Sequence, residues 1–191
     1  MDLWEAFEKR RTIRKFSGPP TDEQIDRVLQ AGSLAPSAGD KQAWFVVIVN
    51  DSEIKEKISE IKKGYNATWT PDTDEGRAKL DVQKKVFKNC TSLVFYTFAP
   101  EPEDPHRADM GSVWMQIENV CLAAVAEGLG TQLFGLSGDV AEGVNTLLGV
   151  PAEYRLVIGV NIGLQHPDYK IPKKTLKPTP EWIFREKWPV E

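Results

Sequence analysis

Apolar residues recur along the chain at two spacings, which divide it into helices and strands. Intervals of three and four residues indicate amphipathic helices, and short continuous apolar runs indicate buried strands. The predicted helices cover about residues 1–11, 21–35, 51–64, 77–88, 107–127 and 139–148. The predicted strands cover residues 45–49, 92–98 and 154–163, with a short strand or extended turn at 131–136. Helices and strands therefore follow one another without regular alternation.

Single residues add local detail to this pattern. Thr21 and Gln24 have the spacing of a capping box, which predicts a helix start. Gly159 inside the last strand indicates a bulge or the close approach of another group. The polar stretch 65–77 predicts a long loop that acts as a lid or mobile segment, in which Trp69 is an alternative packing anchor.

Two segments carry more apolar surface than their own elements explain. The helix at 107–127 is apolar on more than one face, which predicts a central helix that is buried on several sides. A partner subunit is one of the surfaces that could bury it. Residues 164–191 hold five of the thirteen prolines together with Trp182, Phe184 and Trp188. We expect this proline-rich C-terminal extension to lie on a surface, and a neighbouring subunit is one candidate.

Composition narrows the class of protein. The 191 residues are 41% hydrophobic and 27% charged, as expected for one soluble domain over residues 1–191. The net charge of −4 argues against a nucleic-acid-binding protein, which is more often basic. Neither a secretion signal nor an apolar run of membrane-spanning length is present, so we expect a cytoplasmic protein without a membrane partner.

Cysteine and histidine residues give no sign of a metal centre. Cys90 and Cys121 lie in apolar surroundings without CxxC spacing, which predicts buried free thiols. The two histidines, His106 and His166, each stand beside a proline. These residues do not form a zinc-binding pattern.

The segment Lys9–Phe16 holds five positive charges at the point where the first helix gives way to a turn. Cations are favourable at a helix C-terminus, and this explains Lys9, Arg10 and Arg11 without any ligand. Arg14 lies beyond the helix between Ile13 and Phe16, which we expect to anchor the segment. A guanidinium held in this way suits a phosphate or another delocalised anion.

Two further segments bear on an anion site. The stretch 35–44 contains small and polar residues, which would let a flat ligand approach the backbone, although an ordinary helix-to-strand connection explains it equally well. Lys170, Lys173 and Lys174 form a second basic cluster, and such isolated charge runs are most often solvated.

Common nucleotide-binding and hydrolase motifs are absent. No GxGxxG or GxxxxGK[ST] sequence follows a predicted strand, so neither a dinucleotide-binding Rossmann unit nor a P-loop is supported. GxSxG is absent as well, and Ser37 has no histidine placed to activate it.

Four stretches together resemble the FMN-dependent nitroreductase family. They are Arg10–Phe16, Ala35–Trp44, the helix from Asp109 with the Gly128–Thr131 strand start, and Ile171–Leu176. The resemblance implies an α+β fold with a central, mostly antiparallel sheet flanked by helices. It also implies an intertwined homodimer with two FMN molecules at its interface.

The resemblance also implies which residues bind FMN. Arg10, Arg11 and Thr12 would face its phosphate and ribityl end, with Arg14 near N1 and O2 of the ring. Pro36, Ser37 and Ala38 would reach across from the other subunit. The backbone N–H of Gly135 would face N5. No catalytic side chain is expected, because the cofactor itself handles the hydride. The remaining expected contacts are Asp40, Gln42, Asn66, Leu133, Phe134, Leu136 and either Lys173 or Lys174.

This sequence departs from the family at some of these positions. Asp40 and Ala43 stand where many relatives have asparagine and proline. The change at residue 40 argues against the ribityl contact that the resemblance implies there. Leu136 replaces a second glycine and narrows the space near the ring.

The implied activity is a ping-pong transfer of electrons from NADH or NADPH through FMN to a nitroaromatic, quinone or similar planar acceptor. A fixed cation such as Arg14 near N1 and O2 would stabilise the reduced flavin. A reductive dehalogenase or a flavin-destructive enzyme on the same fold remains an alternative, and so does a non-catalytic FMN-binding regulatory protein. A structural dimer without a cofactor would require both basic clusters to be solvated surface.

Overall fold

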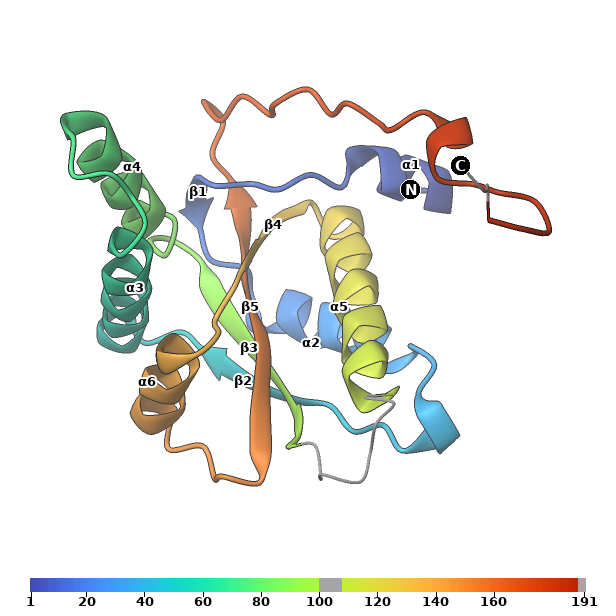
Figure 1. Ribbon diagram of the computed structural model, residues 1–191, viewed down its shortest axis with the longest axis horizontal. Helices are drawn as coiled ribbons and strands as arrows, with labels where there is room; N and C mark the ends of the chain where they lie inside the picture. The colour runs from blue at the N-terminus through green and yellow to red at the C-terminus, as the bar shows by residue number, and fades with distance from the viewer. Residues whose placement is uncertain (100–107, 189–191) are drawn as a thin grey trace.

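A computed structural model describes residues 1–99 and 108–188 (Figure 1). The predicted helix and strand types are confirmed, with changes in some bounds. The elements are α1 (Leu3–Lys9), β1 (Phe16–Gly18), α2 (Asp22–Ser33), the 3₁₀ turn η1 (Ala38–Asp40), β2 (Phe45–Val49), α3 (Ser52–Ala67), α4 (Asp74–Lys85), β3 (Thr91–Phe98), α5 (Ala108–Ala126), β4 (Leu129–Phe134), α6 (Asp139–Leu148), β5 (Tyr154–Gln165) and the 3₁₀ turn η2 (Thr179–Glu181).

The sheet is antiparallel and is organised around β5, as an α+β fold requires. β5 pairs with β3 along one edge and with β4 along the other, and its last residues also pair with β1. β2 pairs only with β3 and forms an outer strand. The expected central, mostly antiparallel sheet is therefore confirmed.

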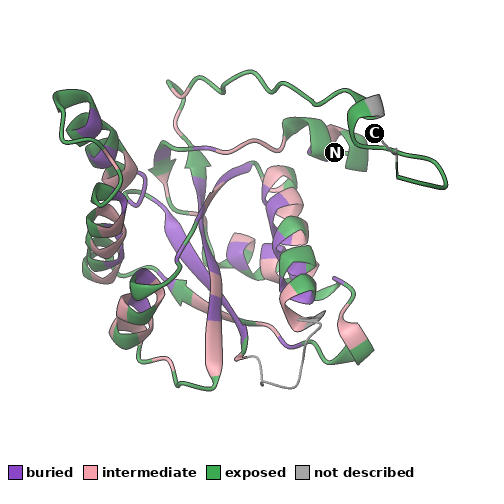
Figure 2. Cartoon of the chain, viewed as in Figure 1, coloured by how far each residue is buried: buried purple, intermediate pink, exposed green. Residues whose placement is uncertain are grey.

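Helices cover both faces of this sheet (Figures 1 and 2). Leu93 and Phe95 of β3 pack with residues of α2 and α5 on one face, whereas Val94 and Tyr96 pack with residues of α3 and α6 on the other. Successive side chains of a strand point to opposite faces, so β3 contributes to both hydrophobic layers. Thr21 and Gln24 form the predicted capping box at the start of α2.

The predicted loop at residues 65–77 is shorter than expected, because only residues 68–73 lie outside a helix. α3 continues through Gly64 to Ala67, and Thr73 caps α4 directly before Asp74. Asn66 lies within α3 and donates from its side-chain nitrogen to Gln83 Oε1 at 2.6 Å. Packing of α3 against α4 stabilises residues that looked like a polar loop in the sequence.

Two apolar segments are less buried than the sequence predicts. The run in β2 predicts a buried strand, but β2 is an outer strand and only Val49 is buried. Trp4 and Phe7 of α1 pack against each other and are 77% and 44% exposed. Val46 and Val47 pack partly against the two hydrophobic layers, whereas Phe45 and Ile48 of β2 stay exposed, as Trp4 and Phe7 do.

Gly159 shows the close approach that the sequence indicates. A Cβ atom built at Gly159 would lie 2.0 Å from the ring of Phe134, which is a buried residue of β4. The register between β3 and β5 also shifts between Phe95 and Tyr96, opposite the residues just before Gly159. The glycine thus makes room for an aromatic ring at the centre of the sheet.

Other sequence-based expectations concern metals, membranes and thiols. His106 lies outside the described residues. Across 1–99 and 108–188, no group of three metal-ligating side chains occurs, and no helix is long and apolar enough to cross a membrane. Cys90 and Cys121 are free and buried, as predicted. Burial raises the pKa of Cys90 to about 12 and that of Cys121 to about 11.

Replacing Gly159 by alanine should destabilise the protein, because the added methyl group overlaps the Phe134 ring. Overpacking of a core typically costs about 1–3 kcal/mol. Equilibrium unfolding in urea measures this loss. Gly64→Ala is a matched control, because a Cβ there meets nothing within 4 Å and alanine favours the helix. Equal effects of the two changes would contradict the packing account.

Both thiols should resist modification in the native protein. Their raised pKa values keep them protonated at pH 8, and the thiolate is the reactive form. We expect a disulfide reagent to label almost no native protein and both cysteines after denaturation. Rapid labelling of the folded chain would contradict this burial.

Candidate cofactor-binding site

The basic segment after α1 lies along β4 and is held by its backbone. Ile13 N donates to Thr131 O at 2.8 Å, and Thr12 and Thr131 form a parallel bridge. Ile13 and Phe16 are buried. Ile13 packs on Gly130, because a Cβ atom built at Gly130 would lie 2.5 Å from the Ile13 side chain. Ile13 and Phe16 therefore anchor the segment, as expected, and leave Arg14 exposed.

The three arginines of this segment have different surroundings. Arg10 Nε lies 3.6 Å from Glu118 Oε1 of α5, and the Arg11 guanidinium donates to the Pro172 carbonyl. Arg14 has neither a hydrogen bond nor an ion pair with any residue that the structure describes. Arg14 is thus an available cation in the segment Lys9–Phe16, which is called the basic corner below.

The C-terminal extension brings the second basic cluster to the same corner. Besides the Arg11 contact, Tyr169 Oη donates to Thr12 O at 3.2 Å. The extension then runs beside the N-terminal segment towards α1 (Figure 1). Lys173 and Lys174 directly follow Pro172 and are exposed, without an ion pair to any described carboxylate. The two basic segments therefore adjoin where Arg11 contacts Pro172.

The stretch 35–44, called the small-residue loop below, lies away from the basic corner of the same chain. Ala38 N donates to Ser112 Oγ near the start of α5, whereas Thr12 bridges Thr131 beyond its end. The 19 residues of α5 make a helix roughly 28 Å long. One chain therefore does not bring Pro36, Ser37 and Ala38 to its own basic corner.

This loop has a fixed internal structure. Asp40 and Gln42 adopt positive φ angles of 54° and 48°. Gln42 N donates to Ser37 Oγ at 3.1 Å, and Gln42 Nε2 donates to Asp40 Oδ1 at 3.1 Å. Asp40 therefore already accepts a hydrogen bond within the loop.

The end of β4 presents backbone at Gly135. Phe134 and Leu136 are buried in the hydrophobic core, so their side chains turn inward, and Leu133 is partly buried. A Cβ built at Gly135 meets nothing within 4 Å. Gly135 thus borders open space, which suits a flat ligand lying against the backbone.

Lys62 of α3 belongs to this part of the site, and the sequence reasoning missed it. Its Nζ donates to Gly135 O at 2.8 Å. Burial lowers the Lys62 pKa. The available signal was its spacing, because Lys62 continues the apolar row Ile54 and Ile58 at four-residue intervals. A lysine on the buried side of a helix is a candidate for a specific role.

Asn66 lies one turn further along α3 from Lys62 and is buried. Its side-chain amide bonds to Gln83 of α4. The described contacts of Asn66 thus belong to helix packing, and the expected flavin contact remains a prediction without a contact that supports it.

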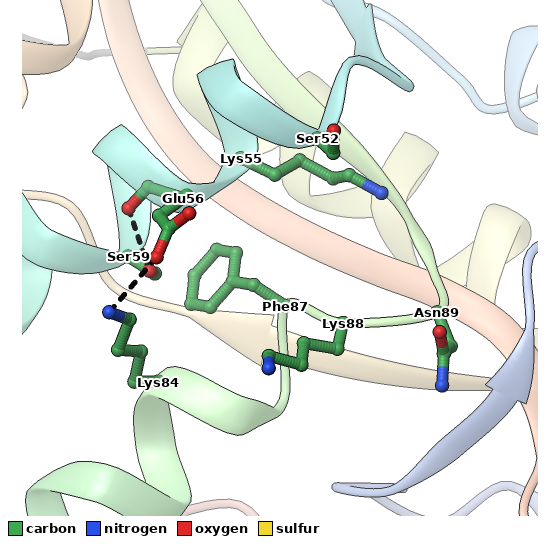
Figure 3. A pocket seen from close by; sticks show the side chains of 8 residues that line it. All are labelled: Ser52, Lys55, Glu56, Ser59, Lys84, Phe87, Lys88 and Asn89. Atoms are coloured by element: carbon green, nitrogen blue, oxygen red, sulfur yellow. Dashed lines mark hydrogen bonds and ion pairs between the residues drawn. The ribbon is translucent and has the colours of Figure 1, made fainter.

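A separate pocket of about 230 Å³ lies where the start of α3 meets the segment after α4 (Figure 3). Lys84 Nζ lies 3.1 Å from Glu56 Oε1, and Lys55 Nζ donates to Cys90 O at 2.6 Å. Two of its three lysines thus already bond to protein oxygens. Phe87 lines the pocket and packs edge-on against Phe134, with ring centroids 4.8 Å apart.

Comparison with known proteins places this geometry in a family context. The model of the nitroreductase family matches residues 7–164. An Archaeoglobus fulgidus protein described as an NADH dehydrogenase/NAD(P)H nitroreductase is 26% identical, over 94% of each chain. Iodotyrosine deiodinase of Thermotoga neapolitana is 29% identical, over 90% of this chain and 91% of its own.

Comparison of the fold with solved structures identifies a protein of the same kind. A crystal structure of iodotyrosine deiodinase bound to FMN and 3-iodo-L-tyrosine superimposes with a TM-score of 0.76. The two sequences are 23% identical, and the match covers 98% of this chain and 100% of the other. The family match spans most of the chain, including the basic corner, the small-residue loop and Gly135. The chain therefore belongs to the nitroreductase family of flavin oxidoreductases.

Proposed function

We propose that the protein binds FMN and transfers electrons from NADH or NADPH to a planar acceptor, such as a nitroaromatic or a quinone, by a ping-pong mechanism. The observation that carries this proposal is the contact of Arg11 with Pro172, which joins the segment of Arg14 to the segment of Lys173 and Lys174. None of these three cations is paired with a described carboxylate. A net negative protein that gathers unpaired cations at one corner is suited to bind a phosphate-bearing ligand.

The residues present fit such a cofactor. Arg11, held against Pro172, and a lysine of the extension supply positive charge for a phosphate. The open backbone at Gly135 suits the edge of a flat ring. FMN, when bound, supplies the two-electron chemistry, and the protein supplies position and electrostatic field. Arg14 is the residue that we assign to stabilising the negative charge gained on reduction.

A second copy of the chain would complete the site. The small-residue loop lies at the opposite end of α5 from the basic corner, so its expected contacts with FMN require a partner. Large apolar side chains are also exposed on the single chain, among them Trp4 and Phe7 of α1 and Trp114 of α5. Exposed apolar surface of this extent is typical of an interface. Both observations support a homodimer.

A reductive dehalogenase is the second candidate. Its support is the similarity to iodotyrosine deiodinase over most of this chain. The two activities differ in their acceptor, so an acceptor screen separates them. Halide release from an iodinated phenol would favour the dehalogenase, and reduction of quinones or nitroaromatics without it would favour the first proposal.

The first test is the absorbance spectrum of the purified protein, followed by identification of any flavin released on denaturation. We expect non-covalent FMN at about one per chain, with bleaching by NADH or NADPH in the absence of oxygen. A colourless protein that does not bind added FMN would overturn the proposal.

Replacing Arg14 by alanine should weaken FMN binding and slow its reduction. Loss of a hydrogen bond to a charged group costs about 1.5–3 kcal/mol, or roughly 10- to 100-fold in affinity. Flavin fluorescence titration and stopped-flow reduction measure the two effects. Lys15→Ala is the matched control, because Lys15 is exposed and lies 3.9 Å from Asp168. Unchanged binding and reduction in Arg14→Ala would remove Arg14 from the site.

A heterodimer tests whether two chains share each site. One chain carries Arg14→Ala and the other Ala38→Trp, which blocks the small-residue loop, and two affinity tags isolate the mixed dimer. Each homodimer should bind FMN poorly, whereas the heterodimer should regain about one intact site of its two. If every contact came from a single chain, both sites of the heterodimer would stay defective.

A further inference from the structure

We propose that Lys62 is a positioning residue of the flavin site, which fixes the Gly135 peptide and places an unneutralised positive charge beside the cofactor. This inference rests on the proposed FMN function. Its geometric basis is the hydrogen bond of 2.8 Å from Lys62 Nζ to Gly135 O. This bond joins α3 to the backbone that is expected to face the flavin.

The position of Lys62 on α3 directs it inward. Ile58, one turn earlier on the same side of the helix, is fully buried, and Ile61 packs against Gly143 of α6. The Lys62 side chain is therefore partly buried at the junction of α3 with the segment between β4 and α6. Its ammonium reaches Gly135, where an added Cβ atom would meet nothing within 4 Å.

The charge of Lys62 is not balanced within the described chain. The neighbouring Lys63 has an ion pair with Asp81 at 2.7 Å, and Lys84 lies 3.1 Å from Glu56. Lys62 contacts only a carbonyl oxygen and has no ion pair with a described carboxylate. A partly buried, unpaired cation destabilises the fold, and such features are kept at functional sites.

Gly135 needs such a restraint because glycine has the most conformational freedom of any residue. A hydrogen bond to its carbonyl limits rotation of the backbone whose N–H is expected to contact flavin N5. The same ammonium lies where water is partly excluded, so its field is stronger than in solution. Lys62 should therefore favour the more negatively charged, reduced form of the cofactor over the oxidised form.

The test compares Lys62→Met and Lys62→Gln with Lys62→Arg, which keeps the charge. Lys63→Met is the matched control, because Lys63 is the next residue of α3 and pairs with Asp81 instead of Gly135. Two quantities are measured: the ratio of the dissociation constants for oxidised and reduced FMN under anaerobic conditions, and the melting temperature of the FMN-free protein. The second measurement needs no cofactor.

We expect both neutral variants to lose about tenfold of the preference for reduced FMN, which corresponds to a potential about 30 mV lower for a two-electron couple. Their FMN-free melting temperature should be unchanged or higher, because an unpaired cation has been removed. Lys62→Arg and Lys63→Met should keep the wild-type preference.

Two results would overturn the inference and leave the proposed function intact. One is an unchanged preference in both neutral variants. The other is an equal loss in Lys63→Met, which would indicate a general effect of removing charge from α3. A wild-type protein that binds no FMN would instead overturn the proposed function together with this inference.

Discussion

The antiparallel pairing of β5 with three other strands positions the basic corner and Gly135. β1, at one end of β5, follows the basic corner, and β4, along its edge, leads directly to Gly135. The chain then leaves β5 into the extension that carries the tail lysines. Close packing at Gly159 lets the Phe134 ring lie on β5, which fixes the end of β4 and leaves Gly135 at the surface of the core. Main-chain hydrogen bonds and one aromatic contact thus set the geometry on which binding depends.

The unpaired cations of the chain indicate what kind of ligand this geometry can bind. The protein is acidic overall, and many of its lysines and arginines pair with nearby carboxylates, as Arg27 does with Glu127. Arg14 follows Ile13, which bonds to Thr131 near the start of β4, and Lys62 reaches Gly135 just after the end of β4. Neither cation is paired with a described carboxylate. Unneutralised cations favour an anionic ligand, and a ring that gains negative charge on reduction would balance both.

Several predictions from the sequence were wrong where neighbouring elements decide the outcome. Tyr65 to Arg77 looks like one long loop because its residues are polar, yet α3 continues to Ala67 and α4 begins at Asp74, which leaves residues 68–73 as the loop. The run in β2 predicts burial on both faces, but β2 has a single strand neighbour. Local composition reports what a segment prefers, and the number of neighbours around it depends on the whole fold.

The sequence by itself determined most of the elements, the buried thiols and the anchoring of Arg14 between Ile13 and Phe16. These features depend on periodicity or on adjacent residues, so they can be read along the chain. The antiparallel α+β class followed from the resemblance of its motifs to a known family. Only the tertiary structure decided that the extension meets the basic corner and that Lys62 reaches Gly135. It also decided that the small-residue loop lies at the far end of α5. These relations join residues far apart in the sequence, and strand pairing and helix length fix them only after the chain has folded.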